Sequence, residues 1–264
     1  MQGFKVLSIS WRTVCQAFII VAFVTAFFPF ALWAQGKQQD PRQLFEKAHE
    51  AQQNGQTELA VSEYRQILQG HPKLVAARAN LAAALVSLGR FDEAIEQYRE
   101  AIRMNHLLPG VHYELAEQLR MSPDPALNAQ AEDEYRAAVG LNPYDEMSWR
   151  QLGSIMAAKG DLKTAEEDYR KALALQPQDS EAKTGLAIVM ISKNQTQDAI
   201  SLLESAVKDD PTNTVAHYRL SGLYRRAGRT EDAEREMKTF RHYTDVKNKL
   251  SKVFKQLAGP TSPM

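Results

Sequence analysis

The sequence predicts an all-α, right-handed superhelical solenoid of about six stacked helix hairpins, closed at its C-terminal end by a capping helix. Over the second half of the chain, alanines recur every 34 residues, at Ala131, Ala165, Ala199 and Ala233. Each repeat holds two stretches of about 13 residues with apolar side chains at helical spacing. A residue suited to a left-handed helix end separates the two stretches. One hairpin cannot bury its apolar face alone, so neighbouring hairpins must stack.

The composition fits a sizeable folded region and excludes several other classes of protein. The chain has 264 residues, of which 44% are apolar and 24% charged, enough for a substantial core. The formal net charge is zero, which argues against a polyelectrolyte and against nucleic acid as a partner. The one cysteine, Cys15, permits neither an intrachain disulfide nor a cysteine zinc site.

The N-terminal segment predicts export across the cytoplasmic membrane. Residues 1–12 carry Lys5 and Arg12 and no acid, and residues 13–34 form an uncharged apolar run ending in Ala34. This order is typical of a signal peptide with a small residue before the cleavage site. The run of 22 residues is also long enough to span a bilayer, so an N-terminal membrane anchor is the alternative. We expect residues 35–40 to be a linker and the rest of the chain to be periplasmic or secreted, or anchored to the membrane.

Six repeat units follow the linker. Their expected bounds are 41–74, 75–108, 109–145, 146–179, 180–213 and 214–247, and the third unit holds three extra residues around 121–126. The expected turn residues between the two helices of a unit are Gly55, Gly89, Gly160, Asn194 and Gly228.

The sixth unit predicts the capping helix. Asp245 stands at the position where a helix-ending proline is expected. The second helix of this unit, beginning near Glu231, is therefore expected to run on, with residues 248–258 as its extension. A kink or a separate capping helix from about Asp245 is the alternative. Residues 259–264 are expected to form a loose tail.

Residues 146–179 carry a recognisable motif: Trp149, Leu152, Gly153, Met156, Ala165, Tyr169, Ala172 and Pro177. The chain resembles tetratricopeptide repeat (TPR) proteins, whose pattern is W-x2-L-G-x2-Y, then A-x3-F, then P. Met156 replaces the first tyrosine of the pattern, and Tyr169 replaces the phenylalanine. The resemblance implies a non-catalytic protein–protein interaction scaffold or adaptor. It also implies that peptide or helix segments bind on a concave groove formed by the first helix of each unit.

In this family, positions 2, 5, 9 and 12 of the first helices line that groove. The candidate partner-binding residues at these positions are Phe45, His49, Ala79, Ala83, Val86, Tyr113, Glu117, Arg120, Arg150, Ser154, Thr184, Ile188, Tyr218 and Arg225. Apolar residues at groove positions favour docking of an apolar segment, whereas close contact between helix pairs is the alternative explanation. No unit has the lysine and asparagine pair by which some family members grip a C-terminal carboxylate.

Sequence motifs for catalysis are absent from the chain. It has no phosphate loop, dinucleotide fingerprint, metalloprotease helix or nucleophile elbow, and its six histidines are scattered over different units. We expect no enzyme activity, no cofactor and no metal. A membrane-tethered assembly factor of an envelope complex is the first alternative function, and a cryptic hydrolase, for which no residue argues, is the second.

Charge is unevenly placed along the repeats. Residues 114–181 hold 14 acids and 7 bases, whereas residues 215–258 hold 11 bases and 5 acids. The basic end suits anionic lipid, an acidic partner or the acidic middle of a second copy. We therefore expect other proteins as partners, with membrane association through residues 13–34 and homo-oligomers as further expectations.

Overall fold

A computed structural model describes residues 40–257, and all regular structure in this range is helical. The predictions for residues 1–34, for most of the linker and for the tail fall outside the described residues. The helices are α2 (Pro41–Gln53), α3 (Thr57–Gly70), α4 (Val75–Ser87), α5 (Phe91–Met104), α6 (Pro109–Met121), α7 (Pro125–Leu141), α8 (Glu146–Ala158), α9 (Leu162–Leu175), α10 (Ser180–Ser192), α11 (Thr196–Asp209), α12 (Thr214–Arg226) and α13 (Thr230–Leu257). None of these helices has the length and apolarity needed to cross a membrane.

The chain divides into two compact units, Met1–Ala84 and Leu85–Met264, with the boundary inside α4. The described part of the first unit holds the α2–α3 hairpin and most of α4. Ala48 and Tyr64 are fully buried between α2 and α3. The Phe45 ring meets the Tyr64 ring edge-on, with 5.7 Å between centroids.

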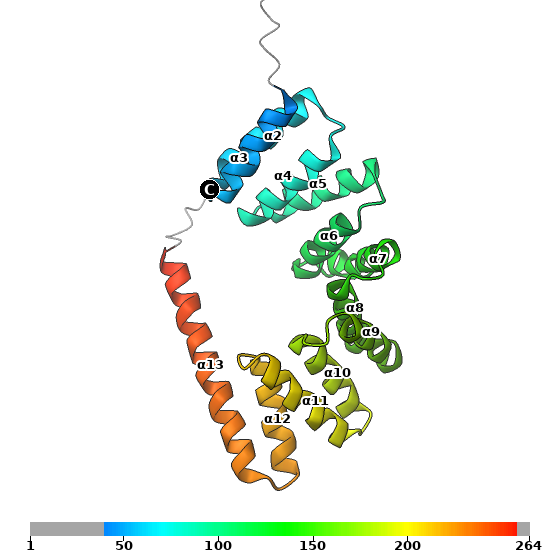
Figure 1. The fold of residues 1–264 in the computed structure, drawn as a ribbon, viewed down its shortest axis with the longest axis vertical. Coiled ribbons are helices and arrows are strands. Elements are labelled where there is room, and N and C mark those ends of the chain that lie inside the picture. The colour runs from blue at the N-terminus through cyan, green and yellow to red at the C-terminus, as the bar shows by residue number, and fades with distance from the viewer. Residues whose placement is uncertain (1–39, 258–264) are drawn as a thin grey trace, which may run out of the picture. The chain divides into compact units, whose positions relative to one another are not determined.

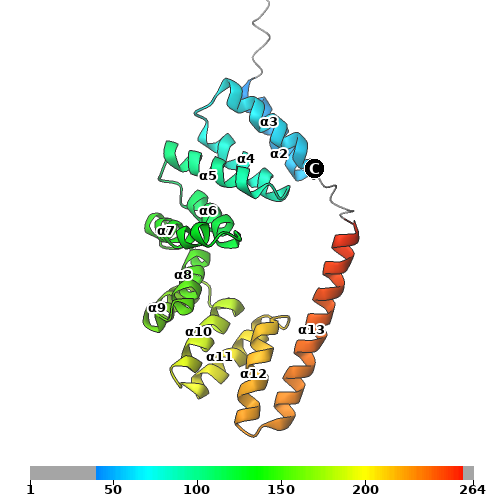
Figure 2. The same cartoon turned by 180° about the vertical axis from the view of Figure 1, so that it is seen from behind.

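The second unit is a row of stacked hairpins. Helices α6 and α7, α8 and α9, and α10 and α11 pair with one another, and each pair contacts the next. In both views, α6 and α8 lie on one side of this row and α7 and α9 on the other (Figures 1 and 2). The first helices begin at residues 41, 75, 109, 146, 180 and 214, which coincide with the expected starts of the six units. The prediction of an all-α fold of stacked hairpins is confirmed.

Left-handed residues end the first helix in five of the six units. Gly55, Gly89 and Gly228 each have φ of 73°, Gly160 has 82° and Asn194 has 60°. These are the five turn residues that the sequence predicts. Glycine has no Cβ to clash in this conformation, and asparagine is one of the few other residues that adopt it readily.

The third unit accommodates its extra residues in the second helix. Helix α7 has 17 residues, whereas α9 and α11 have 14 each. The turn before α7 has no left-handed residue; instead, Asp124 accepts a hydrogen bond from the Ala126 backbone N–H at 2.9 Å and caps the helix. The insertion therefore adds almost one helical turn and leaves the spacing of the hairpins intact.

Helix α13 is a single helix of 28 residues, so of the two arrangements that the sequence left open the structure has the continuous helix and not a separate capping helix. Its first half packs on α12, where the Phe240 ring lies 5.4 Å from the Tyr218 ring, centroid to centroid. The Tyr243 ring stacks on the His217 ring at 6.3 Å. Every described side chain from Asp245 onward is exposed, and the C-terminal part of α13 extends beyond the hairpin (Figure 1).

Tyr169 fills the space between two hairpins because glycines leave room for its ring. A Cβ at Gly153, on the partner helix of the same hairpin, would lie 2.9 Å from Tyr169 Cγ. A Cβ at Gly185, on the next hairpin, would lie 2.3 Å from Tyr169 Cζ. The Tyr169 side chain is only 5% exposed. Close helix contact here requires glycine on both sides of the ring.

A repeated hydrogen bond ties the loop before a first helix to that helix. The fourth residue of the helix donates a side-chain N–H to the carbonyl oxygen six residues earlier. The pairs are Arg78 with Pro72 at 3.0 Å, His112 with His106 at 3.1 Å, Trp149 with Pro143 at 2.9 Å and His217 with Pro211 at 2.9 Å. Trp149, the first residue of the repeat motif, therefore satisfies a loop carbonyl.

Candidate functional site

The predicted groove residues divide between the two units. In the first unit, Phe45 is half-buried against Tyr64, and His49 is exposed and shares a hydrogen bond of 3.0 Å with Gln53. Ala79 and Ala83 are half-buried on α4. The second unit carries the other ten predicted groove residues, of which the first is the half-buried Val86. The remaining nine lie on α6, α8, α10 and α12.

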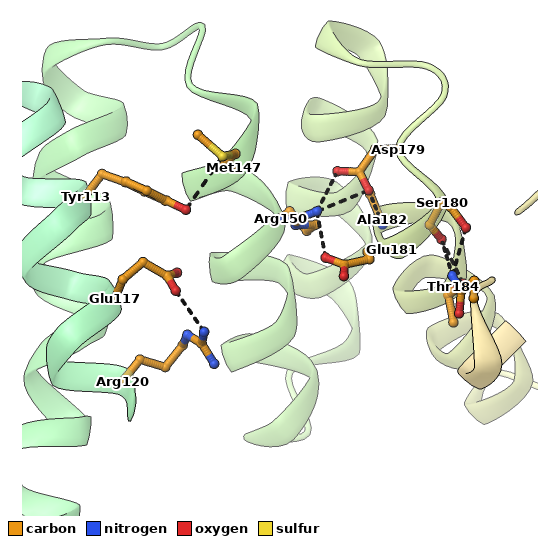
Figure 3. A network of polar contacts seen from close by, with 11 residues as sticks. Tyr113, Glu117, Arg120, Met147, Arg150, Asp179, Ser180, Glu181, Ala182 and Thr184 are labelled. Carbon is orange, nitrogen blue, oxygen red and sulfur yellow. Dashed lines mark hydrogen bonds and ion pairs between the residues drawn. The ribbon is translucent and has the colours of Figure 1, made fainter. Parts of the chain in front are cut away.

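The α6 part of this surface is a self-paired polar cluster (Figure 3). Arg120 Nη2 lies 2.8 Å from Glu117 Oε2, and the Tyr135 hydroxyl donates to the other oxygen of the same carboxylate. The Tyr113 hydroxyl points to Met147 Sδ on α8, at 3.6 Å. Burial, reinforced by the nearby Glu117 charge, raises the pKa of Tyr113 to about 12. Tyr113 is therefore a neutral hydrogen-bond donor at neutral pH.

Arg150 links α8 to the beginning of α10. Its Nη1 lies 2.7 Å from Glu181 Oε2 and 3.3 Å from Asp179 Oδ2 (Figure 3). Asp179 also accepts a hydrogen bond of 2.9 Å from the Ala182 backbone N–H and so caps α10. The charge of Arg150 is thus balanced within the fold, whereas Ser154, one turn further along α8, is exposed.

Thr184 takes part in a buried polar junction between α10 and α12. Its hydroxyl donates to the Ser180 carbonyl at 2.7 Å and accepts from Asn213 Nδ2 at 3.0 Å. Asn213 also donates to Ser180 Oγ at 2.8 Å and caps α12 by accepting from the Ala216 backbone N–H at 3.0 Å. The Thr184 side chain is 4% exposed, so its hydroxyl is used within the protein. Sequence reasoning missed Asn213, although a capping residue directly before a first helix was a usable signal.

A groove of about 690 Å³ lies between α10, α12 and α13. Its apolar lining includes Ile188 from α10, Val215 from α12, and Val246 and Leu250 from α13. Val215 is 50% exposed and Leu250 is 53% exposed, so the core does not need this apolar surface. Of the predicted residues, Thr184 and Ile188 line this groove. The residues from α13 were not predicted, because that helix was expected to do no more than cover the last hairpin.

Two further predicted residues, Tyr218 and Arg225, lie at a second depression, of about 200 Å³, which Ile191 and Gly222 also line. The Tyr218 side chain is 51% exposed, and Arg225 is also exposed. The structure therefore separates the candidates of the second unit into the α6–α8 polar cluster, the groove beside α13 and this smaller depression.

Among residues 40–257, no group of three or more His, Cys, Asp or Glu side chains is placed to hold a metal ion. Two histidines instead each pair with one glutamate across a hairpin. His112 Nδ1 lies 2.6 Å from Glu134 Oε2, and His217 Nδ1 lies 2.6 Å from Glu236 Oε2. The opposite nitrogen of each ring makes the loop contact described above, so both rings are held on two sides.

Two family models match the chain. Residues 45–109 match the tetratricopeptide repeat, and residues 113–241 match the middle TPR-like domain of cilia and flagella-associated protein 70. No curated protein sequence matches the chain.

Solved structures share its fold at low sequence identity. A tetratricopeptide repeat protein from Parabacteroides merdae has a TM-score of 0.63 at 17% identity, over 75% of this chain and 77% of its own. YrrB, described as a TPR protein with an unusual peptide-binding site, has a TM-score of 0.59 at 19% identity, over 71% and 95%. MamA from Desulfovibrio magneticus has a TM-score of 0.56 at 18% identity, over 65% of this chain and 96% of its own. The two family matches show tetratricopeptide-type repeats over residues 45–109 and 113–241, and the solved structures show the same fold of stacked helix hairpins.

Proposed function

We propose that this protein is a non-catalytic scaffold or adaptor that binds a peptide or helix segment of a partner protein in the groove between α10, α12 and α13. The observation that carries the proposal is the exposed apolar lining of this groove, from three different helices. Ligand sites in proteins typically combine such apolar walls with a few polar groups that fix orientation. The peptide-binding site named for YrrB supports the same use of a related fold.

The groove lining also indicates the chemistry of the ligand. Ile188 and Val215 on one side and Val246 on the other suit apolar anchor residues. Glu181 and Asp210 contribute carboxylates, and Lys247 contributes an ammonium group. A segment with two or three apolar anchors and charged flanking residues would therefore be complementary to the groove.

Peptide selection against the purified protein tests this proposal. Peptides enriched from a display library are synthesised, and their Kd is measured by fluorescence anisotropy. Ile188→Asp on α10 and Val215→Asp on α12 each place a charge in the apolar lining, and each should weaken binding about tenfold or more, since each buries a carboxylate against apolar anchors. Ser201→Asp, an exposed position on α11, adds the same charge outside the groove. Equal Kd values for all four proteins would remove the groove from the binding site.

We also propose that the repeats act outside the cytoplasmic membrane, on the basis of the charge pattern of residues 1–34. An adaptor released after cleavage and a membrane-tethered assembly factor differ in one measurable property. Intact mass and N-terminal sequencing of the protein from cells should give Gln35 as the first residue of the cleaved form. A chain beginning at Met1 in the membrane fraction would instead support the anchored form.

A further inference from the structure

The last three turns of α13 expose an apolar stripe that no described part of the protein covers. Val246 lies four residues before Leu250, and Val253 and Phe254 lie three and four residues after it, so the four side chains share one face of the helix. Their side chains are 38%, 53%, 48% and 67% exposed, respectively. Val246 and Leu250 also line the peptide groove, whereas Val253 and Phe254 lie beyond the residues that line it.

Basic residues accompany this stripe along the sequence. Residues 238–257 contain six of them, Lys238, Arg241, Lys247, Lys249, Lys252 and Lys255, against the single acid Asp245. Asp245 Oδ2 lies 2.7 Å from Lys249 Nζ, so it offsets one of these charges and leaves a clear excess. Lys247 and Lys249 stand next to the apolar stripe in sequence and are exposed, as lysines that flank an interfacial helix are.

We infer that the C-terminal half of α13 docks on the surface of an anionic phospholipid bilayer. An amphipathic helix with exposed leucine and phenylalanine on one face and lysines around it has the two properties that such a surface binds. The apolar side chains enter the boundary between headgroups and acyl chains, and the lysines contact lipid phosphates. Residues 13–34 are predicted to bring the chain to a membrane. Such a contact would raise the effective concentration of α13 at the lipid surface.

The acidic middle of a second copy is a poorer match for this basic helix, because several of its carboxylates are already paired. Glu132 contacts Arg136 at 2.7 Å and also Lys159, and Glu166 contacts Arg170 at 2.5 Å. Asp179 pairs with Arg150, as described above. Charge complementarity therefore favours lipid phosphates over this segment of another chain.

A fluorescent probe on the stripe tests the inference in the full chain. In a Cys15→Ser background, Val253→Cys is labelled with an environment-sensitive dye, and Ala174→Cys, exposed on α9, is the matched control site. Vesicles of phosphatidylglycerol and phosphatidylcholine should increase the emission at position 253 but leave position 174 unchanged. Raising salt from about 0.1 M to about 0.5 M should reverse the increase by screening the lysines. No change at position 253, or an equal change with phosphatidylcholine alone, would overturn the inference.

Two double variants distinguish lipid binding through the apolar stripe from an effect of net charge on lipid binding. Val253→Asp with Phe254→Asp should weaken vesicle binding, measured by flotation, about tenfold more than Asn248→Asp with Ser251→Asp, which adds the same charge at exposed polar positions. Equal weakening by the two double variants would contradict docking through the stripe. Sedimentation velocity without lipid gives the remaining outcome: a wild-type dimer that the stripe variant converts to a monomer would assign the stripe to a second copy. Because neither Val253 nor Phe254 lines the groove, these results are independent of the peptide-binding test.

Discussion

Replacing Gly185 by alanine is expected to destabilise the protein, although the same change stabilises most helices. The new Cβ would lie 2.3 Å from Tyr169 Cζ and 2.5 Å from its Cε1, well inside a normal carbon–carbon contact. The ring has no room to retreat, because Gly153 packs against its other side and the side chain is buried. Relief of the overlap therefore requires a shift between two hairpins.

The magnitude follows from two opposing terms. Overpacking a core costs about 1–3 kcal/mol, and an overlap of this size belongs at the upper end. Alanine gains about 1 kcal/mol over glycine in a helix interior. The net loss for Gly185→Ala is about 2 kcal/mol. At Gly222 in α12, a Cβ would meet no atom within 4 Å, so Gly222→Ala should gain up to about 1 kcal/mol.

Urea unfolding followed by circular dichroism measures both changes. The two variants should differ by about 3 kcal/mol in free energy of unfolding, with m-values like that of the wild type. In a Tyr169→Leu background, Gly185→Ala should lose most of its penalty, because the clashing ring is absent. A Gly185→Ala midpoint at or above that of the wild type would refute the packing argument. A penalty that stays undiminished in the Tyr169→Leu background would show that Tyr169 is not the clashing group.

Three further changes test other contacts. Trp149→Phe keeps an aromatic ring but leaves the Pro143 carbonyl without its donor, so it should cost about 1 kcal/mol in urea unfolding, and no loss would show that this bond does not stabilise the fold. The hydrogen bond from Lys193 lowers the pKa of Glu166, so its contribution is present above the pKa of the unfolded carboxyl and is lost as pH falls through the lowered folded value. Glu166→Gln should therefore lower the free energy of unfolding in urea by about 1 kcal/mol at neutral pH, where water screens part of the attraction, and should have no effect in acid. A loss that does not change with pH would contradict the ion pair. Asn213→Ala removes a helix cap and a donor to Thr184 and should cost about 2 kcal/mol or more, which differential scanning calorimetry would show as a lower Tm; an unchanged Tm would contradict the capping role.

The helices and their turns could be predicted from the sequence because the information that specifies them is local. A residue such as Gly160 or Asn194 marks the end of a first helix through its own backbone preference. The 34-residue spacing then places every later helix relative to these marks. The three extra residues near Met121 were also recognised from the sequence. That they lengthen α7 could not be predicted, because Pro125 is compatible with both a turn and the first position of a helix.

The site was harder to predict because its walls come from segments distant in sequence. Ile188 and Val215 both hold groove positions within their repeats, but the part that each takes in this groove depends on which helix lies beside it. The contribution of Leu250 depends on the angle at which α13 leaves α12, which residue spacing does not encode. The tight contact at Gly185 was missed for a related reason: its partner, Tyr169, belongs to the preceding repeat.

Helix α13 is at once a wall of the peptide groove and the carrier of the exposed stripe. At about 1.5 Å per residue it is about 42 Å long, and its C-terminal part extends beyond the hairpin. We expect a ligand that holds this end at one angle to change the separation between Leu250 and Ile188, and with it the affinity of the groove for a peptide. By linkage, a peptide in the groove should change the affinity of the free end by the same factor. Measuring peptide Kd with and without anionic vesicles would give that coupling free energy directly.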